Sequence, residues 1–416
     1  MAEAWGTETI EDAARRIAAA GPSPARPARD PVNRPAIRDW LAAIGDDNPV
    51  YERDGVAPPA MVQVWTMRGL RPGREDPDDP LRAMSAVLDE AGYGSVVATD
   101  CAQTYRRYLR EGELVSVRGR LTGVVGPKRT ALGEGWFVTT ESTWEVDGEP
   151  VADMRFRVLK YRPGAAPPAP RSAPIRPVVS PDTAFFWDGL AAGELRVQRC
   201  GDCGALRHPP GPACPRCGAL KPGYAVAAGT GRVHSYVVHH HPPLPGRRSP
   251  VVVALVDLDE GVRMVGELRG VRPDEVRIGA EVRADLSGDL PVWRPAGPPA
   301  IELPPWELAV TPTVVISTAL ATRDFQDVHH DRDAAVRRGG KDIFLNILTT
   351  TGLVQRYVTD WAGPAAVLRG IEIRLGAPCH PYDTLTFTGS ARGGEVAVSG
   401  RTAAGEHVAG TVRVAP

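Results

Sequence analysis

Long apolar runs are missing from this chain of 416 residues. None approaches the roughly 20 residues that a helix needs to cross a bilayer. The N-terminal stretch also lacks the basic and then apolar order of a secretory signal. Strong charge of either sign is missing too, because the formal net charge is −1, and this excludes a general attraction to nucleic acid or anionic membranes. These absences predict a cytoplasmic protein that binds neither.

Cysteine is scarce as well, with six residues, and a cytosolic setting disfavours structural disulfides. Turn-forming residues are abundant, with 44 Gly and 41 Pro, while apolar residues make up 43% of the chain. That apolar share is enough to fill cores, so the glycines and prolines indicate turns and linkers. The length predicts two or three domains, each with a core of its own.

Four of the six cysteines form two Cys-x-x-Cys pairs, Cys200–Cys203 and Cys214–Cys217. Each pair lets two thiolates converge on one metal ion, and two pairs complete the tetrahedral sulfur cage that zinc prefers at about 2.3 Å. A closed cage leaves no position for water, so we expect the zinc to be structural. Two disulfides or a redox Cys-x-x-Cys are the alternative. Cys101 and Cys379 are expected to be single packed residues.

Two stretches rich in proline and alanine divide the chain. Residues 162–177 read RPGAAPPAPRSAPIRP, which predicts a semi-rigid linker, and residues 290–305 form a second stretch of this kind. Residues 178–289 lie between them and hold an amphipathic segment, the cysteine pairs and several short β-rich runs. The lengths of these runs and the turns between them predict a small barrel.

A short pattern occurs once on each side of this middle segment. Residues 324–331 read DFQDVHHD and residues 45–54 read GDDNPVYERD, and each follows a helix-like run. Each copy has an aspartate five residues ahead of a second position, which is His329 after Asp324 and Tyr51 after Asp46. A phenol with a pKa of about 10 cannot replace an imidazole base near neutral pH. We therefore expect the second copy to do the chemistry and the first to hold the substrate. Taken alone, however, Asp324 could be a turn residue and His329 a surface histidine.

Both copies continue in the same order. A start marked by proline or glycine is followed by an apolar helix, predicted over 60–70 in the first copy and from residue 341 onward in the second. β-type sequence follows each helix. One mostly buried helix followed by antiparallel strands is an α+β pattern.

The repeated motif resembles the signature of the MaoC-like, or hydratase-2, hot-dog family, which runs Asp-x-Asn-Pro-hydrophobic-His. Residues 46–51 read DDNPVY, with tyrosine at the histidine position. Residues 324–329 read DFQDVH, with Gln-Asp in place of Asn-Pro. The VHHDRD stretch is similar to actinobacterial hydratases that act on steroid side-chain enoyl-CoA thioesters.

The middle segment resembles a zinc-ribbon plus OB-fold family found beside thiolase-like and acyl-CoA enzymes, on its QRCGDCG, PACPRCG and VVALVDLDEGVRMVG stretches. The two resemblances together imply an α+β chain in which two hot-dog domains flank a rubredoxin-like zinc ribbon and a small OB-fold barrel. The hot-dog domains are predicted at 1–161 and 306–416 and the ribbon and barrel at 178–289, with linkers at 162–177 and 290–305.

The family resemblance implies an enoyl-CoA hydratase, which adds water to an α,β-unsaturated thioester. Asp324 and His329 would flank the water, orient it and take its proton. The thioester oxygen would lie against backbone N–H groups at the start of the second helix, around Gly340, Lys341 and Ile343, because helix-terminal amides suit developing negative charge. The reaction needs no redox cofactor.

The first copy would form much of the acyl tunnel, with Met61 and Trp65 beside a bulky, steroid-derived acyl group. The resemblance further implies a thiolase-like aldolase as partner, docked on the ribbon and barrel. Two hot dogs in one chain permit a monomer, and a homodimer is equally compatible with the sequence.

A second hypothesis makes the chain a non-catalytic scaffold that holds acyl-CoA for a thiolase-fold enzyme. The intact Asp324/His329 pair argues against it, since a scaffold has no need of that pair. A nucleic-acid-binding barrel is disfavoured, because single-strand sites combine a basic groove with stacking aromatics and the barrel segment is poor in lysine.

Overall fold

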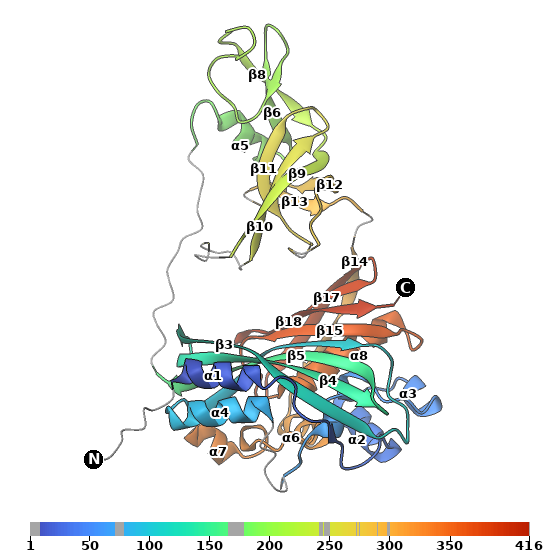
Figure 1. Cartoon of the computed structure of the whole chain (residues 1–416). Coiled ribbons are helices and arrows are strands. Elements are labelled where there is room, and N and C mark those ends of the chain that lie inside the picture. Colours follow the sequence, from blue (N-terminus) through green and yellow to red (C-terminus); the bar gives the residue numbers. More distant parts are fainter. Residues whose placement is uncertain are drawn as a thin grey trace, which may run out of the picture. The chain divides into compact units, whose positions relative to one another are not determined.

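A computed structural model of the chain (Figure 1) describes residues 9–70, 79–164, 179–240, 244, 250–271, 273, 275–288, 290–297 and 300–415. The chain divides into two compact units, one made of Met1–Pro168 with Pro299–Pro416 and the other of Ala169–Pro298. The predicted linker 162–177 lies outside the described residues from residue 165 onward. No helix in the described part of the chain has both the length and the apolar character needed to cross a membrane.

The first unit is built on one ten-stranded sheet with the strand order β1-β3-β4-β5-β2-β15-β18-β17-β16-β14. Its two halves join where β2 pairs antiparallel with β15, with Gln103 opposite Ile371. The two predicted hot-dog segments therefore share one continuous sheet. The strands are β1 Arg26–Pro27, β2 Ser95–Tyr105, β3 Val115–Thr130, β4 Gly133–Val146, β5 Glu149–Pro163, β14 Ile301–Ala309, β15 Leu368–Leu375, β16 Thr384–Arg392, β17 Glu395–Thr402 and β18 Gly405–Val414.

Three helices of this unit pack against the sheet: α1 and α4 lie along β3, as Figure 1 shows, and α8 contacts β14, β15 and β18. A single hydrophobic core runs through both halves and includes Trp40 and Tyr51 from the first and Val354 and Phe387 from the second. The helices and 3₁₀ turns are α1 Ile10–Ala19, α2 Arg34–Ile44, α3 Val50–Arg53, η1 Pro59–Met61, η2 Val64–Thr66, α4 Pro80–Glu90, α6 Pro312–Ala321, η3 Asp327–His329, α7 Arg332–Arg337 and α8 Ile347–Ala362.

The buried central helix is α8. Asn346 caps it by accepting a hydrogen bond from the Thr349 N–H, which satisfies one of the free amides at a helix start. Gly352 lets α8 approach α2 closely, because a Cβ at this position would lie 2.6 Å from a ring carbon of Trp40. This helix begins later than predicted, since residues 341–346 precede it in non-helical conformations.

The apolar helix predicted over 60–70 in the first copy is wrong. Residues 59–66 form only the turns η1 and η2. The N–H of Ala60 donates to the side-chain oxygen of Gln355 on α8, at 2.9 Å, and Gly69 has a left-handed φ of 80°. The backbone is thus held by a side chain of the other half, and no helix like α8 forms at 59–69.

The second unit begins with α5 Ala184–Ala191 and a three-stranded sheet in the order β7-β6-β8. A closed barrel follows, in the order β10-β11-β13-β12-β9, so the predicted ribbon and barrel are confirmed. The strands are β6 Leu195–Cys200, β7 Leu206–Arg207, β8 Pro222–Ala227, β9 Thr230–His239, β10 Val251–Leu258, β11 Arg263–Leu268, β12 Glu281–Asp285 and β13 Val292–Pro295.

The second predicted linker, 290–305, is partly wrong. Residues 292–295 form β13, which closes the barrel, and Trp293 is fully buried there. Residues 301–305 already belong to β14 at the edge of the large sheet. The apolar residues of this stretch decide the outcome, because burying Trp293 outweighs the tendency of the prolines to interrupt strands.

Candidate functional site

The second copy of the motif brings Asp324 and His329 together as predicted. Asp324 follows α6 after Arg323, whose left-handed φ of 56° turns the chain, and His329 ends η3. Each residue is only 5% exposed. His329 Nε2 lies 3.6 Å from Asp324 Oδ2, too far for a direct hydrogen bond. Both groups can therefore contact one molecule placed between them.

The protonation pattern of His329 follows from its second ring nitrogen. Nδ1 lies 2.8 Å from the carbonyl oxygen of Phe344. A carbonyl can only accept, so Nδ1 donates its hydrogen and the neutral ring keeps the lone pair on Nε2. The Phe344 ring packs edge-on against the imidazole, with the ring centres 4.9 Å apart. Nε2 is thus held as a base on the side of Asp324.

The first copy is closed by α8. The Tyr51 hydroxyl accepts a hydrogen bond from Gln355 Nε2 at 3.1 Å and is 2% exposed, and burial raises its pKa well above the ordinary value. Asp46 accepts from the Asn48 N–H at 3.0 Å, and burial raises the pKa of its carboxyl. Tyr51 and Gln355 thus form a buried contact between the first and second halves of the unit. Neither Asp46 nor Tyr51 offers a base comparable to His329.

Two cavities meet at Asp324. The larger has a volume of about 430 Å³ and lies mainly in the first half, and the smaller has about 260 Å³ and includes His329. The smaller one reaches the surface at Val96, which is 39% exposed. Residues shared by both cavities mark the junction: Gln63, Met67, Leu81, Phe156, Asp324 and Gln326. A long ligand could pass the Asp324/His329 pair with its ends in different cavities.

The predicted thioester residues do not lie in these cavities. Neither cavity is lined by Gly340, Lys341 or Ile343. The Gly340 N–H donates to Ala335 O at 2.9 Å and the Ile343 N–H to Asp342 Oδ1 at 2.8 Å. Their predicted role depends on a helix that starts near residue 341, and α8 starts at Ile347.

The first residues of α8 line the smaller cavity instead. Ile347 and Leu348 line the smaller cavity together with His329. Their N–H groups stand in the first turn, where a helix has no internal acceptors, and the helix dipole favours negative charge at this end. A thioester oxygen in the smaller cavity would meet these two amides.

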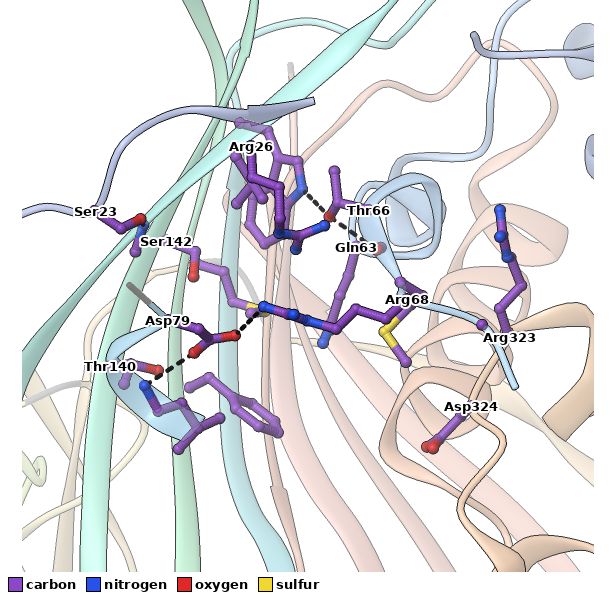
Figure 2. Close-up of a pocket in the computed structure, with 18 of the residues that line it drawn as sticks. Ser23, Arg26, Gln63, Thr66, Arg68, Asp79, Thr140, Ser142, Arg323 and Asp324 are labelled. Carbon is purple, nitrogen blue, oxygen red and sulfur yellow. Dashed lines mark hydrogen bonds and ion pairs between the residues drawn. The ribbon is translucent and has the colours of Figure 1, made fainter. Parts of the chain in front are cut away.

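The predicted tunnel residues are core residues instead. Met61 is fully buried and Trp65 is 4% exposed, and neither lines the two cavities. Their neighbours Gln63, Thr66 and Met67 line the larger one. Figure 2 shows Gln63 extending from this segment into the cavity. A helix over 60–70 would place Met61 and Trp65 at the tunnel. The two 3₁₀ turns instead place the polar side chains of Gln63 and Thr66 at the larger cavity.

Sequence reasoning also missed Asn346, which lines the smaller cavity and is 3% exposed. Its Nδ2 donates to Thr322 Oγ1 at 2.8 Å, while its Oδ1 accepts from the Thr349 N–H at 2.7 Å. It therefore ties the start of α8 to the residue two positions before Asp324. An asparagine ahead of a helix was the available signal, once the helix start was placed correctly.

Asn346→Ala is expected to remove both bonds. We expect the free energy of unfolding to fall by about 1 kcal/mol from the lost cap. We also expect kcat to fall by about tenfold, because Asp324 and the start of α8 lose their fixed spacing. Asn33→Ala is the matched control, since Asn33 caps α2 by accepting from the Ala36 N–H. Denaturant unfolding and steady-state hydration assays check both. Equal kcat losses in the two variants would contradict the positioning role.

The four paired cysteines converge on one point in the second unit. Their Sγ atoms all lie within 4.8 Å of one another, with Cys200–Cys217 at 3.6 Å and Cys203–Cys214 at 3.7 Å. Tetrahedral zinc with bonds of about 2.3 Å requires sulfurs about 3.8 Å apart, so the cage fits zinc. Backbone amides of the second pair lower the pKa of the Cys214 thiol to about 6, which favours the thiolate that binds metal.

Comparison with protein-family models gives three matches. Residues 20–154 match the FAS1-like dehydratase domain region. Residues 187–222 match the ChsH2 rubredoxin-like zinc ribbon domain and residues 224–287 the ChsH2 C-terminal OB-fold domain. The zinc ribbon match and the sulfur geometry agree, so the metal site is a structural zinc site.

Two curated relatives from Mycobacterium tuberculosis match different shares of the chain. The 3-oxo-4,17-pregnadiene-20-carboxyl-CoA hydratase alpha subunit is 52% identical over 303 residues, covering 69% of this chain and 96% of that protein. The beta subunit of the same hydratase is 58% identical over 117 residues, covering 27% of this chain and 91% of that protein. One chain here therefore carries counterparts of two separate subunits.

Among solved structures, a MaoC-like dehydratase covers 94% of this chain and 96% of its own, with 16% identity and a TM-score of 0.50. This likeness confirms the predicted hot-dog fold. The solved Ltp2-ChsH2(DUF35) aldolase is 47% identical and covers 29% of this chain and 100% of that chain, with a TM-score of 0.28.

Proposed function

Since this chain belongs to the family formed by the alpha and beta subunits of 3-oxo-4,17-pregnadiene-20-carboxyl-CoA hydratase, we propose that it hydrates an α,β-unsaturated acyl-CoA with a bulky, steroid-derived acyl group. The observation that carries the proposal is the buried Asp324/His329 pair at the junction of two cavities. Both halves of the reaction site lie in the same chain, so no second subunit is needed to complete it.

The pair performs the proton transfers of the reaction. A water between Asp324 and His329 gives a proton to the lone pair on Nε2 as its oxygen bonds to Cβ of the substrate. The C=C electrons move to the thioester, and Cα then takes the proton from Nε2 of the His329 imidazolium, which returns to its neutral form. The net result is one water added across the double bond. The hydrogen bond from Nδ1 to Phe344 O supports the imidazolium that forms.

The α8 N-terminus stabilises the intermediate charge. During addition, negative charge develops on the thioester oxygen, and the first-turn amides of Ile347 and Leu348 would donate to it. Both residues line the smaller cavity, which supports this assignment. Removing one donor of this kind typically costs about 2.7–4 kcal/mol of transition-state stabilisation. The smaller cavity therefore holds the thioester. The CoA arm extends from the thioester to the protein surface through the opening of this cavity at Val96.

The larger cavity takes the acyl group. It lies beside the two 3₁₀ turns at 59–66, where the first half has no helix like α8. Its volume of about 430 Å³ falls within the range of roughly 300–1,000 Å³ of ligand pockets. An acyl chain of few carbons would fill little of this space, so the cavity suits a bulky group.

Filling the larger cavity tests the substrate assignment. Val117→Phe adds bulk to a residue of β3 that lines the cavity, and overpacking typically costs about 1–3 kcal/mol. We expect kcat/KM for a steroid enoyl-CoA to fall by about 10- to 100-fold, while crotonyl-CoA is hydrated nearly as before. Val125→Phe is the control, because Val125 lies on the same strand and is 52% exposed. A uniform loss for both substrates in Val117→Phe would contradict the assignment.

The barrel carries the surface that we propose for the aldolase partner. Across β9, β10 and β11, outward-facing apolar residues pair directly, with Val237 opposite Val253 and Leu255 opposite Val265. Val237 and Val265 are 63% and 59% exposed. Contiguous exposed apolar residues of this kind mark interaction sites. A thiolase-fold aldolase docked here would receive the hydrated thioester, which a retro-aldol step can cleave.

Charges on this surface are expected to break the complex. In the full chain, Val237→Glu with Val265→Glu should weaken binding to a purified thiolase-fold aldolase by at least about tenfold, as loss of central apolar contacts does. Hydratase activity should not change, because the catalytic groups belong to the other unit. Val125→Glu, on the exposed part of β3, is the control in a titration by biolayer interferometry. Unchanged binding would show that the aldolase docks on a different surface.

We also propose that the reaction takes place in the cytoplasm. No disulfide joins any of the six cysteines, and a reducing compartment keeps the thiolates of a zinc site from forming disulfides. Fractionation of the producing cells, followed by hydratase assay, tests this placement.

A further inference from the structure

The larger cavity has a polar wall that hydration does not use. Side chains alternate along a strand, and on β4 Thr140, Ser142 and Trp144 all line the cavity. Thr143 points to the opposite face, where its hydroxyl donates to Asp153 at 2.9 Å. Two hydroxyls thus stand in a row of inward positions that is otherwise apolar.

Within the part of the chain that the structure describes, these two hydroxyls have no hydrogen-bond partner. Thr140 is 4% exposed and Ser142 is half-buried. Across the described residues, neither hydroxyl makes a hydrogen bond, whereas the neighbouring Trp144 donates its indole N–H to Thr66 Oγ1 at 2.9 Å. Both residues line the cavity, so a hydrogen-bond acceptor on a ligand can replace water as the partner of these hydroxyls.

An ion pair faces the same space. Arg68 Nη2 lies 3.0 Å from Asp79 Oδ2, and Asp79 Oδ1 accepts from the N–H groups of Leu81 and Arg82 at the start of α4. The carboxylate is thus occupied by three donors. Arginine offers only donors, and a hydroxyl hydrogen rotates to meet an acceptor. The polar wall, defined as Thr140, Ser142 and the Arg68–Asp79 pair, therefore presents chiefly hydrogen-bond donors to the cavity.

The polar wall lies away from the reacting bond. Of the two cavities that meet at Asp324, its residues line the larger one and not the smaller, whereas Met67, Leu81 and Phe156 line both. Figure 2 shows Thr140, Ser142 and Asp79 across the cavity from Asp324, with the Arg68–Asp79 ion pair between them. A substrate would meet apolar side chains beside its double bond and the polar wall at the far end of its acyl group.

We infer that the polar wall recognises a carbonyl oxygen on the ring system of the acyl group, so that the larger cavity selects ring ketones over the corresponding hydrocarbons. This inference rests on the proposed function and names the feature of the acyl group that the site reads. A site built to bond a polar group rejects the analogue that lacks it more strongly than an apolar pocket rejects a methylene. Thr140 and Ser142 are thus specificity-determining residues.

Binding of unreactive thioesters tests this inference separately from hydration. Saturated steroid side-chain CoA thioesters with a ring ketone, and the same compounds without it, are titrated into the full zinc-loaded chain by isothermal calorimetry. We expect the ketone to bind about 10- to 100-fold more tightly, as two hydrogen bonds allow. Thr140→Val with Ser142→Ala should reduce that ratio to about threefold or less. Thr143→Val, on the other face of β4, should keep the wild-type ratio.

Equal affinity of the wild type for the two thioesters would overturn the inference, and so would binding of neither. A preserved ratio in the Thr140/Ser142 double variant would also overturn it, because the selectivity would then come from other residues. If the chain binds the ketone more tightly but does not hydrate enoyl-CoA, the proposed reaction is wrong and the role of the polar wall still stands.

Discussion

Asp324→Asn and His329→Ala are each expected to lower kcat for enoyl-CoA hydration by about 10²- to 10⁴-fold, the usual worth of a positioned acid–base group. Asp324→Asn keeps the shape of the side chain but removes its charge, and His329→Ala removes the Nε2 lone pair that faces Asp324. Both side chains are buried, so the loss of absorbance of the conjugated thioester should be accompanied by a circular dichroism check of folding.

The first copy of the motif supplies the matched control. Asp46→Asn makes the same change at the equivalent position, where the side chain lies beside Tyr51 and α8. We expect hydratase activity within about threefold of wild type, since surface or structural changes away from the reacting groups leave transition-state stabilisation intact. A large loss of hydratase activity in Asp46→Asn, together with full activity in Asp324→Asn, would mean that the first copy carries out the reaction and the second holds the substrate.

The same assay separates the enzyme from the scaffold hypothesis. A non-catalytic scaffold would bind acyl-CoA and show no hydration with wild type or variant. The scaffold has no use for a base whose Nδ1 is bonded to Phe344 O and whose Nε2 faces a carboxylate. Wild-type hydration that depends on both residues would therefore exclude the scaffold reading.

Removal of zinc is expected to unfold the ribbon while the hydratase stays active. Apparent binding energies of structural zinc sites are about 10–16 kcal/mol, comparable to or larger than the stability of a typical domain. Cys214→Ser, or treatment with a strong chelator, should therefore abolish the thermal transition of the Ala169–Pro298 unit. Hydration should persist, because Asp324, His329 and both cavities belong to the other unit.

Asp202→Asn is the matched variant for the zinc experiment. Asp202 lies inside the first cysteine pair, and its carboxylate pairs with Lys221 at 3.1 Å without taking part in the sulfur cage. We expect it to keep zinc and the ribbon transition, as measured by metal analysis and calorimetry. Loss of hydration on zinc removal, with the large unit still folded, would contradict the separation of the two functions. Loss of aldolase binding in Cys214→Ser would be expected, since the docking surface belongs to the unfolded unit.

The sequence by itself determined the features whose chemistry is local. The four zinc-binding cysteines lie within 18 positions, so two short turns suffice to bring their sulfurs together. The Asp324/His329 pair is five residues apart on one turn, and Asp46/Tyr51 is its altered copy. Spacing alone could therefore predict the ribbon, the α+β class and the difference between the two copies.

Only the tertiary structure decided how the halves share the site. Gln355 reaches 304 positions along the chain to bond Tyr51, and it also holds the Ala60 N–H. That contact keeps residues 59–66 as two 3₁₀ turns, so Gln63 and Met67 line the larger cavity while Met61 and Trp65 join the core. Propensity over a short window contains no information about a partner that distant.

The start of α8 was decided in the same way. A pair of glycines at 339–340 suggested a helix from residue 341, but Asn346 caps it at Ile347 by bonding both Thr349 and the distant Thr322. The position that we propose for the thioester oxygen therefore lies at Ile347 and Leu348 and not at residues 340–343. Local sequence fixes chemistry that is carried by neighbours in the chain, whereas the cavities, the closed first copy and the oxygen-binding amides depend on packing between two halves that are distant in sequence.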